Sequence, residues 1–268
     1  MEEMKFALDT FYAIMSGALV MWMAAGFTML EAGLVQKKDV SEIVTKNLGL
    51  FSIACVMYLV CGFALMYPAD AVFAIAGGLD EAGEAISYGI FPAIATSWGL
   101  STDLPLEEIG MAYGMNYSQQ ADFFFQVVFV ATAMSIVSGA VAGRMKLIPF
   151  FIFTVILTAF IYPVQGYWNW GGGFLSLLGY SDYAGSGTVH LLGAAAALGV
   201  VTLLGARNGK YGTDGSINPM PGSNIPLAAL GVLILWLGWF GFNGGSELVI
   251  SDEASAIAVS QVFLNTNM

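Results

Sequence analysis

The sequence predicts an all-α, polytopic membrane protein. Of its 268 residues, 57% are hydrophobic and only 10% are charged, and its mean hydropathy is +0.75. Soluble domains carry about 25% charged residues, so most of this surface must face a bilayer rather than water. The same composition excludes a disordered chain, and a formal charge of −11 without a basic cluster excludes nucleic-acid binding.

Seven apolar runs are the predicted membrane segments, because about 20 apolar residues cross a bilayer as a helix. The first run follows Glu2 and Glu3 rather than a basic segment, so we expect it to stay in the protein and not to be a cleaved signal peptide. The last run begins near Ala254 and is shorter than a full span. The runs cover about 6–34, 48–68, 123–142, 147–166, 189–206, 225–243 and 254–268.

Basic residues predict the orientation of these segments. Seven of the eight Lys and Arg residues fall in the connections after the first, third and fifth runs, which must lie on one side. The positive-inside rule makes that side cytoplasmic and places the N-terminus outside. The opposite connections are acidic, above all the stretch 69–121, which either keeps the loops soluble or concentrates cations. The seven basic residues are Lys37, Lys38, Lys46, Arg144, Lys146, Arg207 and Lys210.

Small residues predict close packing of the segments. The chain has 33 glycines, and small residues let helix backbones approach each other in membranes. Ser135, Gly139 and Gly143 form such a row on the third segment. Cys55 and Cys61 have neither disulfide nor metal-site spacing, so we interpret them as small core residues. No metal site is expected.

The only histidine, His190, begins the fifth segment. Polar groups inside a membrane are costly, so they are commonly functional. Imidazole can donate a hydrogen bond on one nitrogen and accept one on the other, which suits a small molecule with N–H groups and a lone pair. The alternative is a structural histidine packed against a neighbouring helix.

Asp182 precedes His190 by eight residues, among glycines that allow tight turns. A carboxylate in this position can cap free backbone N–H groups. It can also favour cations at a nearby mouth, and the two roles are compatible.

Aromatic residues cluster beside glycines at the segment ends. Trp and Tyr belts at the membrane interface explain many such residues. Rings grouped at a mouth can also bind a cation, with about 0.5–2 kcal/mol per contact. Periodicity does not separate these alternatives. The clustered residues are Phe123, Phe124, Phe125, Trp168, Trp170, Trp239, Phe240 and Phe242.

These motifs together are similar to those of one family. They are Trp170-Gly171-Gly172-Gly173; Asp182-Tyr183-Ala184-Gly185 leading to Thr188-Val189-His190; the run from Gly238 to Ser246; and Phe125-Gln126 with Gly139 to Arg144. The chain resembles the ammonium transporters, relatives of the Rhesus proteins, from its first segment to its last residue.

The resemblance implies a function and roles for single residues. Phe125, Trp170 and Ser246 would recruit ammonium on the outer side, supported by Asp182. Phe125 and Phe242 would form a stacked phenyl gate, and His190 would be the first of two pore histidines. The cation would lose its proton near the gate and ammonia would pass the histidines. This is transport, with no enzyme activity and no cofactor.

The family fold is an eleven-helix homotrimer built from two inverted five-helix repeats. Residues 1–268 would then hold the first repeat, the sixth helix and the start of the seventh in an ammonium-transporter-like bundle that looks truncated, without the second pore histidine. Expected partners are ammonium, ammonia, the bilayer of the cell membrane and a nitrogen-regulatory signal protein at 207–224. The alternatives are an incomplete fragment without transport of its own and an ammonium sensor. A retinal protein would need a buried lysine in its final helix, and no segment has one.

Overall fold

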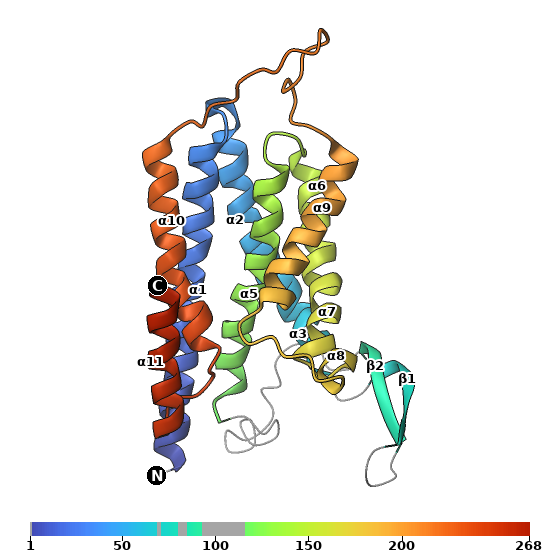
Figure 1. Ribbon diagram of the computed structural model, residues 1–268, viewed down its shortest axis with the longest axis vertical. Coiled ribbons are helices and arrows are strands. Elements are labelled where there is room, and N and C mark those ends of the chain that lie inside the picture. The colour runs from blue at the N-terminus through green and yellow to red at the C-terminus, as the bar shows by residue number, and fades with distance from the viewer. Residues whose placement is uncertain (1, 69–70, 80–84, 93–115) are drawn as a thin grey trace.

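A computed structural model describes residues 2–68, 71–79, 85–92 and 116–268, and it is a bundle of helices along one long axis (Figure 1). Six helical stretches among these residues are long and apolar enough to cross a membrane. The prediction of an all-α, multi-pass membrane fold is therefore confirmed. The six stretches are Glu2–Leu34, Lys37–Met66, Gln119–Val141, Leu147–Leu177, Ser186–Leu204 and Ile225–Gly244.

Several of these stretches combine an α-helix with a π-helical turn. Such turns interrupt the regular ladder and are frequent at functional sites. In the first half the elements are α1 (Glu2–Leu34), α2 (Val40–Met57), a π turn (Tyr58–Gly62), α3 (Phe63–Met66) and α5 (Gln119–Val141). They continue with α6 (Leu147–Ile156), a π turn (Leu157–Ile161), α7 (Tyr162–Asn169) and α8 (Phe174–Leu177). The rest are a π turn (Ser186–Leu191), α9 (Leu192–Leu204), α10 (Ile225–Trp239), a π turn (Phe240–Gly244) and α11 (Glu253–Asn267).

Capping residues explain where the later helices begin. The Ser118 side chain accepts a hydrogen bond from Ala121 N (3.2 Å), and Asn224 caps α10 in the same way through Leu227 N (3.0 Å). Because Ser118 starts the helix, α5 begins at Gln119, four residues before the apolar run that predicted it.

The core lies around α5. This helix packs against α1, α2 and α9, and its residues from Val127 to Val130 are buried. Figure 1 shows α5 inside the bundle with α2 and α9 on either side. A helix that is apolar on all faces is stable there because its neighbours cover all of them.

Glycines bring α1 and α10 into close contact. A Cβ atom at Gly231 would lie 2.7 Å from Gly26 O, and one at Gly33 would lie 2.6 Å from Asn224 O. The predicted row on α5 is only partly a packing row. Gly139 faces Glu31, but Gly143 lies past the end of the helix with φ of +67°, so it serves the turn.

The three basic connections lie together at one end of the bundle (Figure 1). Lys46 corrects the predicted pattern, because α2 begins at Val40 and Lys46 is inside it, 1% exposed. Its Nζ atom lies 2.9 Å from Glu42 Oε1 and donates to Met145 O. Lys46 is therefore a buried helix residue and not a loop residue.

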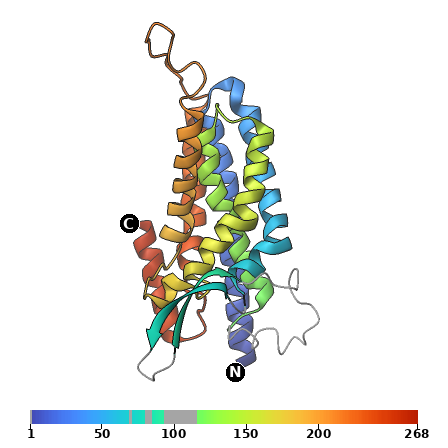
Figure 2. The same ribbon diagram turned by 90° about the vertical axis from the view of Figure 1, so that its right-hand side faces the viewer.

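A β-hairpin within the acidic stretch 69–121 was not predicted. Strands β1 (Ala71–Leu79) and β2 (Ala85–Pro92) pair antiparallel, from Ala71 opposite Pro92 to Leu79 opposite Ala85. Figure 2 shows the hairpin at the same end as the N-terminus, where β2 lies near α7 and α8. The sequence predicted an acidic external loop over this stretch, without strands. Residues 69–70, 80–84 and 93–115 lie outside the described part.

Candidate functional site

Two buried phenyl rings form the centre of the candidate site. Phe129 of α5 and Phe242 of the π turn Phe240–Gly244 stack with ring centroids 4.0 Å apart and planes 26° from parallel. Both are 1% exposed. The two rings are therefore tightly packed against each other inside the protein.

The structure corrects the predicted partner of Phe242. The resemblance placed Phe125 in the stacked pair, but Phe125 lies one helical turn earlier and packs on Phe129 with centroids 4.7 Å apart. Residues four apart share a helix face, so both rings point the same way and only the depth along α5 selects the partner. The assignment of Phe125 to the stacked pair is wrong. Phe129 was missed, although it follows the Phe-Gln motif on the same face.

Trp170 joins the aromatic group from the end of α7. Its ring meets Phe129 edge-on at 6.1 Å between centroids. The indole Nε1 donates to the backbone oxygen of Asp182 (2.8 Å), which fixes the ring. Phe125 and Trp170 thus both pack on Phe129, and the three rings form one aromatic group.

Ser246 lies in the turn that follows Phe242. Its Oγ donates to Phe242 O (2.7 Å), so the hydroxyl proton is used and the oxygen lone pairs stay available as acceptors. A Cβ atom at the adjacent Gly245 would lie 2.6 Å from the Phe125 ring. The turn that carries Ser246 therefore packs against the aromatic group.

Asp182 caps the helix that carries His190. Its Oδ1 accepts from the N–H groups of Gly185 (3.0 Å) and Ser186 (2.9 Å), and its Oδ2 from those of Gly187 (3.0 Å) and Thr188 (2.7 Å). A carboxylate at this place satisfies free donors and interacts well with the positive end of the helix. The structure thus shows the capping role expected from the sequence.

His190 contacts Phe242, whereas Trp170 and Phe125 contact Phe129. Its ring meets Phe242 edge-on at 5.4 Å and lies parallel to Trp239 at 5.8 Å. Nδ1 is 3.2 Å from Gly185 O, which leaves Nε2 without a protein partner in the described contacts. Trp239 was not singled out as a neighbour of His190, although both lie in motifs that the sequence marked.

His190 and Phe242 both lie in π-helical turns, which affect the directions of their side chains. His190 belongs to the turn Ser186–Leu191 and Phe242 to the turn Phe240–Gly244. A π turn shifts the side chains after it relative to a regular helix, so it can turn one ring towards another. Nothing in an apolar run marks such a turn.

Polar groups line a hollow of about 310 Å³ beside Asp182. Asn243 Nδ2 donates to Thr266 Oγ1 across it (3.1 Å). At its rim Tyr183 Oη donates to Glu247 Oε2 (2.8 Å), and burial together with Glu247 raises the pKa of Tyr183. This hydrogen bond links the two loops that carry Asp182 and Ser246. The hollow is lined by Asp182, Tyr183, Ala184, Ser186, Asn243, Val262, Asn265 and Thr266.

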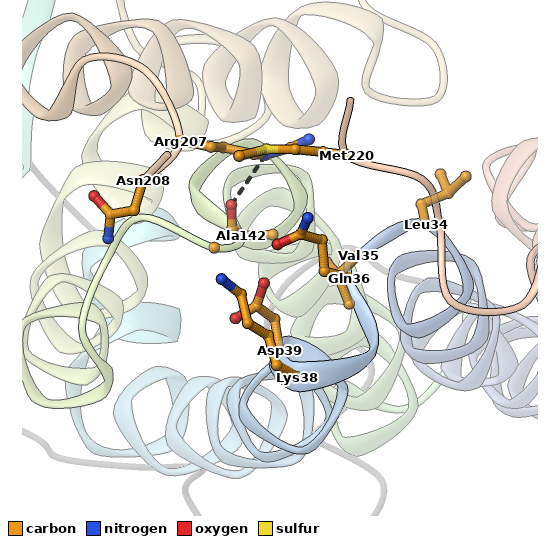
Figure 3. Close-up of a pocket in the computed structure, with 10 residues that line it drawn as sticks. Leu34, Val35, Gln36, Lys38, Asp39, Ala142, Arg207, Asn208 and Met220 are labelled. Atoms are coloured by element: carbon orange, nitrogen blue, oxygen red, sulfur yellow. Dashed lines mark hydrogen bonds between the residues drawn. The ribbon is translucent and has the colours of Figure 1, made fainter. Parts of the chain in front are cut away.

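A smaller cavity, about 70 Å³, lies at the opposite end where the three basic connections meet (Figure 3). Arg207 Nε donates to Ala142 O (3.2 Å), and Arg144 Nη1 donates to Gly205 O. Both guanidinium groups thus satisfy carbonyls at the ends of α5 and α9, where a positive charge is favourable. These arginines hold the connections together.

Metal ligands are not grouped in the described ranges: no set of three or more His, Cys, Asp or Glu residues there could hold a metal ion.

Comparisons with known proteins agree on one family. A sequence model described as "Ammonium Transporter Family" matches residues 11–268. The chain is 39% identical to the ammonium transporter Amt2 of Archaeoglobus fulgidus over all of its own length and 52% of that protein. It is 35% identical to the ammonium transporter Amt2 of Methanocaldococcus jannaschii, over 95% of the chain and 54% of the relative. The chain spans about half the length of these relatives.

Solved structures give the same result. A structure titled "Sensor Amt Protein" superposes with a TM-score of 0.81 at 34% identity, covering all of this chain and 60% of the other. Candida albicans Mep2 superposes with a TM-score of 0.72 at 24% identity, covering 93% of this chain and 50% of the other. At that identity the second match supports the fold alone.

Proposed function

Because the chain belongs to the ammonium transporter family, we propose that it forms part of a transmembrane path for ammonium that runs past the Phe129–Phe242 pair. One observation carries the proposal: Trp170 contacts one ring of this buried pair, Phe129, and His190 contacts the other, Phe242, to whose carbonyl the Ser246 hydroxyl donates. We infer that Trp170 and Ser246 face the recruitment side and His190 the far side. The path would lie in the cell membrane with the N-terminus outside. The relatives are named as transporters, and the activity proposed is not enzymatic.

Recruitment of the cation uses the rings of Trp170 and Phe125 and the oxygen of Ser246. A cation over an aromatic face gains about 0.5–2 kcal/mol, and more when water is excluded. The hydrogen bond from Ser246 Oγ to Phe242 O directs the hydroxyl proton away and leaves an acceptor for an ammonium N–H. Ammonium differs from potassium in its N–H donors, so this oxygen would favour ammonium binding.

Deprotonation occurs at the phenyl pair. Moving an unpaired charge between two buried rings is penalised by many kcal/mol, whereas neutral ammonia carries no such penalty. Ammonium therefore gives up its proton to the solvent on the recruitment side, and neutral ammonia passes Phe129 and Phe242. The carboxylate of Asp182 stabilises positive charge on that side and fixes the helix start through its four hydrogen bonds.

His190 receives ammonia beyond the rings. Its Nδ1 faces Gly185 O, so the neutral tautomer with a proton on Nδ1 presents Nε2 as an acceptor for an ammonia N–H. A polar group in an otherwise apolar passage lowers the cost of dehydrating ammonia. The stacking on Trp239 keeps the ring in this orientation.

Assembly and regulation are part of the same proposal. We expect a homotrimer in a lipid bilayer and a nitrogen-regulatory signal protein at the basic end, with the loop 207–224 as one contact. Sensing instead of transport has the support of one structure title, while the curated relatives compared above are both named as transporters.

The test of this proposal measures ammonium uptake by the complete protein in proteoliposomes. Trp170→Leu and Ser246→Ala should each weaken ammonium recruitment about fivefold, since each removes a contact of about 1 kcal/mol. Trp22→Leu is the matched control, because Trp22 lies on α1 with 57% of its surface exposed. Equal uptake and selectivity in Trp170→Leu and Trp22→Leu would refute the recruitment site.

A further inference from the structure

A buried carboxylate lies outside the aromatic site, at the N-terminal end of α5. Asp122 is 2% exposed. Its Oδ1 is 3.4 Å from the hydroxyl of Tyr117, and its Oδ2 has no hydrogen-bond partner in the described part of the chain. Burial, followed by the charge of Asp122, raises the pKa of Tyr117, so this hydroxyl stays protonated and donates. Among the described residues the carboxylate thus has only a long hydrogen bond from Tyr117 and the side-chain amide of Gln126 as donors.

Other unpartnered oxygens belong to Gln126, next to Asp122 on α5, and to Tyr162, which is linked to Asp122 through Tyr58. Gln126, one turn further along α5, interacts with the carboxylate, and its Oε1 is buried without a partner among the described residues. Tyr162 is fully buried and its hydroxyl is also unpartnered there. The hydroxyl of Tyr58 interacts electrostatically with both Asp122 and Tyr162. We call Asp122, Gln126, Tyr58, Tyr117 and Tyr162 the Asp122 cluster.

Two π turns build this cluster. Tyr58 opens the turn Tyr58–Gly62 and Tyr162 directly follows the turn Leu157–Ile161. The turns touch closely, since a Cβ atom at Gly62 would lie 3.2 Å from Thr158 O. The side chains of Tyr58 and Tyr162 are therefore positioned by backbone features that recur at functional sites, as at His190 and Phe242.

Basic side chains are absent from this region of the chain. Residues 47–143 contain no Lys, Arg or His, including the part that the structure does not describe. Lys5 interacts with Asp252, and Lys46 pairs with Glu42. A buried carboxylate without a counter-charge is strongly disfavoured, and no described basic side chain pairs with Asp122, so we infer that a group other than these side chains neutralises it.

We propose that the Asp122 cluster binds one monovalent cation, at a site separate from the Trp170 recruitment site. The charge follows from the single carboxylate, because calcium and magnesium sites gather more oxygen ligands and commonly more carboxylates. The ligands follow from the unpartnered oxygens of Asp122, Gln126 and Tyr162, which are acceptors for ammonium N–H groups and ligands for sodium or potassium. The shared chemistry is one positive charge held by oxygen atoms.

Binding of radioactive thallium(I) to the purified chain in detergent tests the proposal. Thallium is supplied as the nitrate because its chloride is poorly soluble. Asp122→Asn keeps the shape of the side chain but removes the charge, and should weaken binding about tenfold or more. Tyr162→Phe removes one oxygen and should weaken it about threefold to tenfold. Trp170→Leu should leave this binding intact.

Glu31→Gln is the matched control. Glu31 is also a buried carboxylate, but Ser138 Oγ (2.6 Å) and Asn47 Nδ2 (2.8 Å) donate to its two oxygens. Thallium affinity should therefore be unchanged in this variant.

Competition identifies the occupant. Displacement of thallium by ammonium, sodium or potassium nitrate supports the proposal and ranks the three cations. Displacement by magnesium at a lower concentration than by any of them would overturn it. Saturable thallium binding that persists unchanged in Asp122→Asn and Tyr162→Phe would also overturn the proposal. A Trp170→Leu protein that shows no saturable thallium binding would overturn it as well. An infrared band of a protonated carboxyl that disappears in Asp122→Asn would then identify a proton as the neutralising group.

Discussion

Replacing Asp182 by alanine removes four hydrogen bonds at the start of the helix that carries His190. Both carboxylate oxygens are in use, each with two backbone N–H donors at 2.7 to 3.0 Å. Loss of a single capping side chain costs about 0.5–2 kcal/mol. Because a charged acceptor is lost and four donors are freed at a half-buried place, we expect Asp182→Ala to lower the free energy of unfolding by about 2–4 kcal/mol.

The substitution Asp182→Asn separates the hydrogen bonds from the charge. The amide keeps one oxygen acceptor, and its NH₂ group faces two backbone donors that it cannot satisfy. We expect about half of the loss seen in Asp182→Ala, because about half of the acceptor capacity remains. Ammonium uptake should fall in both variants, and more in Asp182→Ala, where the turn Ser186–Leu191 no longer holds His190 in place.

Unfolding in mixed micelles of dodecyl maltoside and dodecyl sulfate measures the effect, with tryptophan fluorescence as the signal. Asp214→Ala is the matched control, since Asp214 is an exposed loop carboxylate that accepts from Ser216 N. The reasoning would be refuted by an Asp182→Ala protein within about 0.5 kcal/mol of both the wild type and this control, which is the range of ordinary surface substitutions.

Three further predictions follow from the fold and the rings. In a double-mutant cycle on unfolding, Phe129 and Phe242 should couple by about 0.5–1.5 kcal/mol, whereas Phe125 and Phe242 should not; equal coupling would contradict the assignment of the stacked pair. A cysteine at position 210, in a chain without its native cysteines, should react with an impermeant thiol reagent only from the cytoplasmic side. Labelling of this cysteine from outside intact cells would contradict the predicted orientation. Gly231→Leu should unfold or strongly destabilise the bundle, by about 3 kcal/mol or more, because α1 leaves no room for the side chain; a thermal unfolding midpoint like that of the wild type would refute this packing.

The helices were predictable because long apolar runs have few other stable states in a chain this poor in charge. Their starts were less predictable. The apolar run that predicted α5 begins at Phe123. The helix itself begins earlier, because Ser118 caps it and the polar residues Gln119 and Asp122 are helical and buried. Likewise the charge of Lys46 predicted a loop residue, although inside α2 it pairs with Glu42 and donates to the Met145 carbonyl.

Most residues of the candidate site could be predicted from the sequence, but the contacts between its aromatic rings could not. The motifs marked Trp170, Asp182, His190 and Phe242, and the capping by Asp182 follows from its place before a helix. The partner of Phe242 was not predictable, because residues four apart on α5 share a face and the difference is one turn of depth. That depth depends on the π turn that carries Phe242, and an apolar run gives no sign of such a turn.

Ammonia entry through His190 is the most direct test of the proposed path. Proteoliposomes that contain the complete protein and an internal pH dye are mixed rapidly with an ammonium gradient, and the rise in internal pH is recorded. We predict a fast rise for the wild type and for the control Tyr211→Phe, an exposed loop residue, and no protein-dependent rise for His190→Ala. A His190→Gln protein that folds, assembles and conducts ammonia at the wild-type rate would contradict the proposed path.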